Sequence, residues 1–77
     1  MGEIAQFIAL PFDLIDGVLV AGEQFKCAGP ASAIQRAKGY WQTLGHSGAV
    51  ALIRTGYPEP HPTVLRAFGN VPDHLPI

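Results

Sequence analysis

The sequence predicts an α+β fold, in which one helix packs on a short antiparallel sheet of three to four strands in the order β-(β)-α-β-β. Three features of the sequence support this prediction. Residues 3–12 and 49–53 contain stretches that are apolar at both strand parities, which is typical of strands buried on both faces. Residues 30–44 carry apolar side chains at helical spacing. Turn-forming residues separate these segments from one another.

The length and the composition bound the possible architectures. A chain of 77 residues has room for one domain, which we place at residues 1–77, with an irregular tail over residues 71–77. Hydrophobic residues make up 48% and charged residues 14% of the chain, whereas ordinary soluble domains carry roughly 25% charged residues. This composition excludes a disordered chain. It also suggests that another molecule covers part of the apolar surface.

The N-terminal third predicts a strand followed by a turn. We expect an interior strand over Glu3 to Phe12, with Pro11 near its end, where a missing N–H is tolerated. The dipeptide Asp16-Gly17 favours the tight turn of a hairpin, and Glu23 to Cys27 could add a short strand. The sequence leaves open whether the segment between the first strand and the helix forms this hairpin.

Residues 30–44 form the clearest helix of the sequence. Pro30 suits the first helical turn, where its fixed φ is already helical and no donor is lost. Gly45 supplies the left-handed residue that ends a helix. We expect the apolar stripe to face the sheet, so that Trp41 belongs to the core, whereas Tyr40 points away from the stripe and is exposed. The stripe consists of Ile34, Ala37, Trp41 and Leu44.

The C-terminal third predicts a β-hairpin with a long loop. Ser47 to Thr55 forms one strand and Thr63 to Phe68 the other. Residues 56–62 cannot be regular structure, because three prolines remove backbone donors and restrict their neighbours. If Thr55 pairs with Thr63, both arginines of the hairpin, Arg54 and Arg66, share one face of the sheet.

The predicted layers leave one face of the sheet without cover. The helix covers one face, yet the strands are apolar on both. We therefore expect either a second molecule or residues 13–27 to cover the other face. The function that follows is a small protein-binding or assembly module that self-associates as a homodimer, in which two sheets meet by face or by edge.

An arginine beside an aromatic side chain on a sheet is typical of recognition surfaces. Such surfaces bind proteins or single-stranded nucleic acid. We expect the partner to be a second copy of the chain or another protein. The predicted partner surface consists of Arg54, Arg66, Phe68 and Tyr40.

Several short strings occur along most of the chain: IALPF at residues 8–12, AIQRA at 33–37, GHSGAVA at 45–51, RTG at 54–56 and FGNVP at 68–72. In these strings the chain resembles a family of small uncharacterised bacterial proteins of about this length. No activity is known for that family, so the resemblance implies no function.

Residues suited to catalysis or metal binding are few and scattered. His46, His61 and His74 lie far apart in the sequence, and no cysteine or carboxylate completes a zinc-type spacing. Cys27 is the only cysteine, so no disulfide can form within the chain. Ser47 follows a histidine, but adjacent residues of an extended chain point to opposite faces. We therefore expect no catalytic residue, no metal and no cofactor, and we predict that the protein is not an enzyme.

The charge balance argues against a dedicated nucleic-acid binder. The formal net charge is −1, whereas such proteins usually show a clear basic excess. The stretch between Gln24 and Pro58 nevertheless contains basic residues and no acid. The alternative function is therefore a nucleic-acid-binding accessory protein with a local basic surface. That surface would use Lys26, Arg36, Lys38, Arg54 and Arg66.

No part of the sequence indicates export or insertion into a membrane. The N-terminus lacks the positive region of a secretory signal. No stretch approaches the roughly 20 apolar residues that cross a bilayer, and a lone thiol fits a reducing compartment. We expect a cytoplasmic protein.

Overall fold

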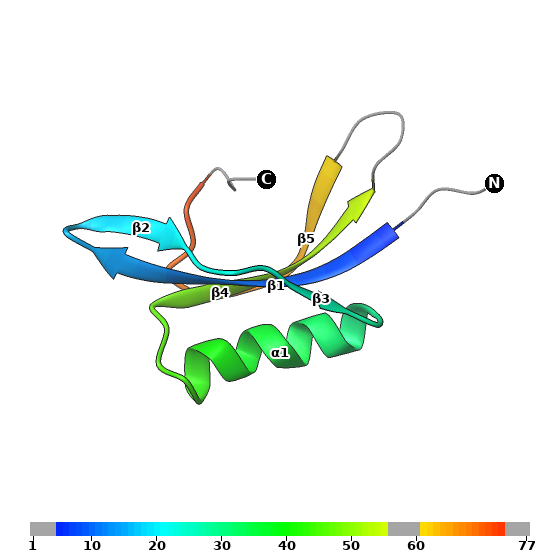
Figure 1. The fold of residues 1–77 in the computed structure, drawn as a ribbon, viewed down its shortest axis with the longest axis horizontal. Helices are drawn as coiled ribbons and strands as arrows, with labels where there is room; N and C mark the ends of the chain where they lie inside the picture. Colours follow the sequence, from blue (N-terminus) through cyan, green and yellow to red (C-terminus); the bar gives the residue numbers. More distant parts are fainter. Residues whose placement is uncertain (1–4, 56–60, 74–77) are drawn as a thin grey trace.

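A computed structural model describes residues 5–55 and 61–73 of the chain. One helix lies along one face of a five-stranded antiparallel sheet (Figure 1). The α+β class is as predicted, with one strand more than the three to four expected. The elements are β1 (Ala5–Ile15), β2 (Val18–Ala21), β3 (Phe25–Cys27), α1 (Pro30–Gln42), β4 (Gly48–Thr55) and β5 (His61–Gly69).

The additional strand arises because one edge of the sheet is divided in two. The strand order is β2-β1-β4-β5, and β3 also pairs with β1. Residues 5–12 of β1 pair with β4 on one side. Because Phe7 to Ala9 pair with β3 as well, β3 lies on the same side of β1 as β2. The two short strands therefore form two halves of one edge.

Pro11 explains where this edge is divided. The predicted strand ended at Phe12, but β1 continues to Ile15, so Pro11 lies in the middle of the strand and not near its end. A proline has no N–H to donate to a neighbouring strand. Its carbonyl oxygen accepts a hydrogen bond from the Gly22 N–H at 2.8 Å, and a Cβ at Gly22 would lie 3.0 Å from the proline Cγ. Pairing stops here and resumes at β3.

The predicted Asp16-Gly17 turn is present between β1 and β2. Both residues have positive φ, 52° and 79°, as a two-residue hairpin turn of type I′ requires. Ile15 pairs with Val18 directly across the turn. The short strand expected within residues 23–27 is also present, as β3.

The helix begins at Pro30, as predicted, and is followed by Gly45 with φ of 79°. Among the stripe residues only Ala37 is buried, and Ala33 joins it. The prediction that Trp41 belongs to the core is wrong, because its side chain is 39% exposed. Tyr40 is half-buried and not exposed.

The core cluster of buried residues on the helix side of the sheet consists of alanines. Their small side chains let the helix backbone approach the strands closely, which leaves larger helix residues at the periphery. Trp41 is displaced for this reason and stacks on Phe68 at the rim. The alanines are Ala9, Ala33, Ala37, Ala49 and Ala51.

The second face of the sheet is closed by the chain itself. Leu19 and Ala21 of β2 pack against it, as does Val71, which lies in the segment after β5, on the opposite side of the sheet from α1 (Figure 1). Residues 13–27 therefore supply part of the cover that the sequence required. The enclosed side chains are 0–1% exposed and belong to Ile8, Leu10, Phe12, Val50 and Leu52.

The predicted register of the last hairpin is wrong. Thr55 pairs with His61 and not with Thr63, and a β-bulge lies between Ala51 and Leu52. The bulge leaves Leu65 without a partner on β4 and sets Arg66 opposite Ala51. The two arginines consequently lie on opposite faces.

The expected loop of residues 56–62 lies partly outside the described residues. His61 and Pro62 belong to β5, which corrects that expectation, and the proline is tolerated because β5 is an edge strand. Residues 71–73 contain no helix or strand, and the rest of the predicted tail is outside the described residues. Within the described ranges, no helix is long and apolar enough to cross a membrane.

Candidate interaction surfaces

The structure does not bring the predicted partner residues together. Arg54 lies on the face opposite the helix, where its Nη2 donates to Gln6 Oε1 at 2.6 Å. Arg66 and Phe68 lie on the helix side, with the guanidinium carbon 5.7 Å from the ring centre. Tyr40 packs against the alanine cluster. The proposed single surface of these four residues is therefore not formed.

The basic residues also lie on different sides of the molecule. Arg36 lies over the ring of Phe25 on β3, with the guanidinium carbon 3.8 Å from the ring centre. Lys38 lines a different hollow, on the β5 side of the helix. Lys26 lies opposite Ile8, on the face away from the helix. Because the five basic residues occupy different sides, they do not form one continuous basic patch.

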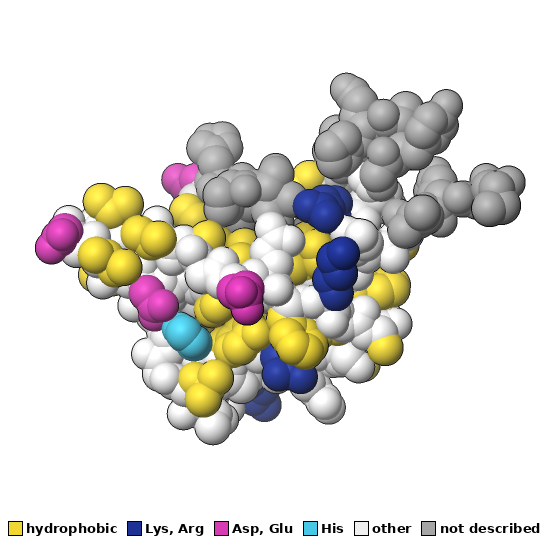
Figure 2. Space-filling view, viewed as in Figure 1, with side chains coloured by type: hydrophobic (Ala, Val, Ile, Leu, Met, Phe, Trp, Pro, Cys, Tyr) yellow, Lys and Arg dark blue, Asp and Glu magenta, His cyan; other side chains and the backbone are white. Residues whose placement is uncertain are grey.

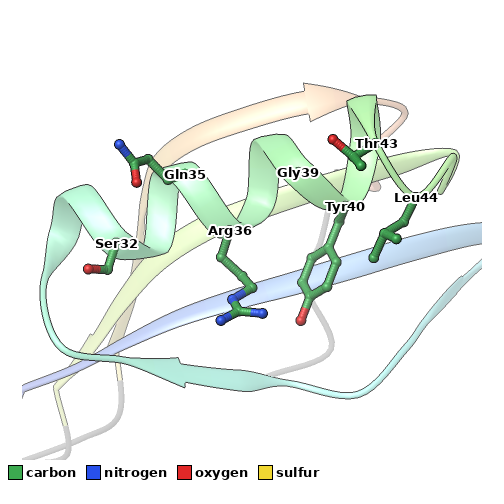
Figure 3. Close-up of a pocket in the computed structure, with 7 residues that line it drawn as sticks. All are labelled: Ser32, Gln35, Arg36, Gly39, Tyr40, Thr43 and Leu44. Atoms are coloured by element: carbon green, nitrogen blue, oxygen red, sulfur yellow. The ribbon is translucent and has the colours of Figure 1, made fainter.

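A shallow groove of about 470 Å³ follows the outer side of α1. Figure 3 shows Arg36 and Tyr40 extending from the helix toward the side where the β2–β3 segment passes. No side chain projects from the helix at Gly39, where a Cβ would meet nothing within 4 Å. The described lining residues are Ser32, Gln35, Arg36, Gly39, Tyr40, Thr43 and Leu44.

His46 is held by a carboxylate that the sequence did not indicate. Its Nδ1 lies 2.9 Å from Asp13 Oδ1 and 3.1 Å from Oδ2, and the ring of Tyr40 meets the imidazole edge-on at 5.5 Å. The His46 backbone N–H also donates to the Tyr40 carbonyl oxygen at 3.0 Å. The pair thus ties the end of α1 to β1.

A histidine oriented by a carboxylate resembles a general base, but the described residues around it assemble neither a nucleophile nor a metal-ligand set. Ser47 Oγ accepts the Leu14 N–H at 3.2 Å. Cys27 Sγ lies 3.7 Å from the Phe25 carbonyl oxygen, and its half-buried side chain packs against the alanine cluster. Within the described residues, no three His, Cys, Asp or Glu side chains gather. The side chains of the other two histidines are outside the described part.

Half of the exposed large hydrophobic residues in the described part of the chain lie on the β1–β2 hairpin. Figure 2 shows hydrophobic side chains gathered at this end of the sheet, with acidic side chains beside them. Asp13 and Val20 are paired, as are Ile15 and Val18, so these four side chains share the helix side. Their apolar members are strongly exposed: Ile15 54%, Val18 61% and Val20 43%.

The backbone of β2 turns part of its hydrogen-bonding groups away from β1, and no other described strand pairs with β2 on that side. The Leu14 N–H points to Ser47, away from β2. Leu14 and its partner Leu19 therefore form a pair without mutual hydrogen bonds, in which the groups of Leu19 point outward. The same alternation turns the N–H and C=O of Ala21 outward.

The two edges of the sheet differ in protection. Along β5, Pro62, the bulge and the charged Arg66 all hinder the addition of a further strand. The sequence of β2 is Val-Leu-Val-Ala, without charge or proline, and its register with β1 has no bulge. The edge at β2 is therefore the one suited to pairing with another strand.

Comparisons with protein-family models, with curated proteins and with solved structures found no match to this chain. The resemblance to small bacterial proteins stays a prediction.

Proposed function

We propose that this chain is a small protein-binding module that self-associates as a homodimer, and that β2 is the strand through which two copies join. The observation that supports this proposal most is the unprotected edge of β2 beside the exposed Val18 and Val20. A strand with free backbone groups and apolar side chains pairs readily with another strand. The face-to-face arrangement has less support, because the second face of the sheet is already buried within one chain.

The outward groups of β2 suit a symmetric antiparallel pair centred on Val20. A two-fold axis perpendicular to the sheet places residues of the same parity opposite each other. Centred on Val20, each Leu19 would exchange both backbone hydrogen bonds with Ala21 of the second copy. The small alanine side chain leaves room for the leucine, and the two Val20 side chains meet on the helix side.

The charges at the ends of β2 are compatible with this register. Asp16 and Glu23 flank the strand. In the pair centred on Val20, Asp16 lies opposite Gln24 of the second copy, and Glu23 lies opposite Gly17. Two acids directly opposite each other across paired strands would be unfavourable, and this register has no such pair.

We also propose a reducing compartment such as the cytoplasm, in which Cys27 remains a thiol.

Sedimentation equilibrium of the wild type and of two variants tests the proposal. Val20→Lys places a charge at the centre of the pair, and Ala21→Pro removes an outward N–H that β1 does not use. We expect the wild type to sediment as a dimer and each variant to dissociate about tenfold more readily or worse, since about 1.4 kcal/mol corresponds to a factor of ten.

The matched control is Val64→Lys, which adds the same charge to the other edge strand at a position that is 48% exposed. This variant should remain dimeric. A monomeric wild type at tens of micromolar would overturn the proposal, as would a dimer that both β2 variants leave intact. A stable complex of β2 with a different protein, in place of a second copy, would likewise contradict self-association.

A further inference from the structure

A hollow of about 400 Å³ lies between α1 and the edge strand β5. One wall comes from the side of the helix that faces β5, and the other comes from β5 itself. Sites for small molecules commonly have volumes of about 300–1,000 Å³, so the hollow is large enough for a ligand. Its described lining residues are Ile34, Lys38, Trp41, Gln42, Arg66 and Phe68.

One part of the hollow is a rigid aromatic surface. Trp41 and Phe68 are stacked, with ring centres 5.8 Å apart and planes 29° apart. The indole is held tightly, because a Cβ at Gly69 would lie 2.5 Å from its Nε1, and Gly69 itself has φ of 65°. Trp41 nevertheless remains 39% exposed. A fixed, accessible indole is a stacking platform for a flat ring.

The β-bulge directs a cation to this platform. In a regular strand with no bulge, residues 64 and 66 would lie on the same face, so Arg66 would share the face of Val64, opposite the helix. With the bulge, Arg66 pairs with Ala51 on the helix side and lines the hollow. Bulges often re-aim a side chain next to a functional site.

The charge of the hollow has one sign. Lys38 from the helix and Arg66 from β5 both line it and are both exposed. None of its described lining residues is acidic. Two cations beside a stacking surface favour a ligand that carries an anionic group next to a planar ring.

We propose that this hollow binds a nucleotide unit, with the base stacked on Trp41 and the phosphate bound by Lys38 and Arg66. The unit is either a free nucleotide or one residue of a single-stranded nucleic acid. The inference does not depend on self-association, because the hollow lies at β5 and the proposed dimer edge lies at β2.

Trp41 is the only tryptophan of the chain, so its fluorescence reports on the hollow directly. We would titrate the wild type with adenosine monophosphate, with a short single-stranded oligonucleotide, with adenosine and with inorganic phosphate. We expect adenosine monophosphate or the oligonucleotide to quench the Trp41 fluorescence saturably. Adenosine alone and phosphate alone should bind at least about tenfold more weakly. Tighter binding of adenosine monophosphate would identify a free nucleotide as the ligand. Tighter binding of the oligonucleotide would identify single-stranded nucleic acid.

Lys38→Gln and Arg66→Gln should each weaken binding roughly tenfold, because each removes a charge-assisted contact. Both side chains are exposed, and circular dichroism verifies that the variants fold. The matched control is Arg36→Gln, on the same helix but stacked on Phe25, and it should bind as the wild type does. The proposal is overturned if neither nucleotide nor strand quenches Trp41 saturably, if the pocket variants bind normally, or if the control weakens binding equally.

Discussion

The two faces of the sheet are filled by different means. On the helix side the core cluster of buried residues consists of alanines, two from the helix and three from the strands. On the other side five large side chains are 0–1% exposed, and in the described part of the chain a short edge strand and the segment at Val71 pack against them. Small side chains are needed where a helix covers a sheet closely, and large ones where a strand and a loop must close it.

The largest expected effect is on the face of large side chains. Phe12→Ala removes the largest fully buried side chain among the described residues and should lower the free energy of unfolding by about 3–5 kcal/mol. This is a large part of the roughly 5–15 kcal/mol that is typical of native proteins. Urea unfolding followed by circular dichroism measures the loss. Val64→Ala, at an exposed position, serves as the control. A loss below about 1 kcal/mol would mean that this face is not closed as described.

The alanine face should respond to the opposite change. Ala37→Leu adds bulk where the helix meets the strands, at a residue that is 0% exposed, and overpacking of this kind costs about 1–3 kcal/mol. Gln35→Leu adds a similar side chain on the exposed side of the same helix and should have little effect. The measurement is again the free energy of unfolding in urea. Unchanged stability of the Ala37 variant would show that the helix is not held close to the sheet.

The smallest expected effect has the opposite sign. Gly39 lies within α1, but a Cβ there would meet nothing within 4 Å. Gly39→Ala should therefore raise the midpoint of thermal unfolding, with a gain of about 1 kcal/mol in stability. The comparison with Ala37→Leu distinguishes a small residue required by packing from one that is not. A lower midpoint would indicate that Gly39 makes a contact on which the fold depends.

Features that depend on neighbouring residues were predictable from the sequence. The positive φ values at Asp16 and Gly17 follow from the preferences of a two-residue turn. Gly45 adopts the predicted left-handed conformation, although the helix ends at Gln42 with Thr43 as its cap residue and so stops two residues earlier than predicted. The run of apolar residues at both parities correctly predicted an interior strand, since β4 lies between β1 and β5.

Features that depend on distant pairing were not predictable in this way. The bulge beside Ala51 has no signal in the local sequence, yet it decides which face Arg66 occupies. The Asp13–His46 contact joins residues 33 positions apart and exists because β1 pairs with β4 so that Phe12 lies opposite Gly48. Trp41 was assigned to the core from helical spacing alone, which does not reveal that the facing strands are alanine-rich and leave no room for an indole.

The unequal edges of the sheet also limit the stoichiometry of any assembly. Joining at β2 occupies that part of the edge in both copies at once, and what remains outside is the three-residue strand β3 and the protected strand β5, which hinders a third copy. A sheet with two unprotected edges would pair with a further copy at each edge and form fibres. With one unprotected edge per copy, assembly stops at the dimer. The difference between the two edges therefore permits association and also limits it to two copies.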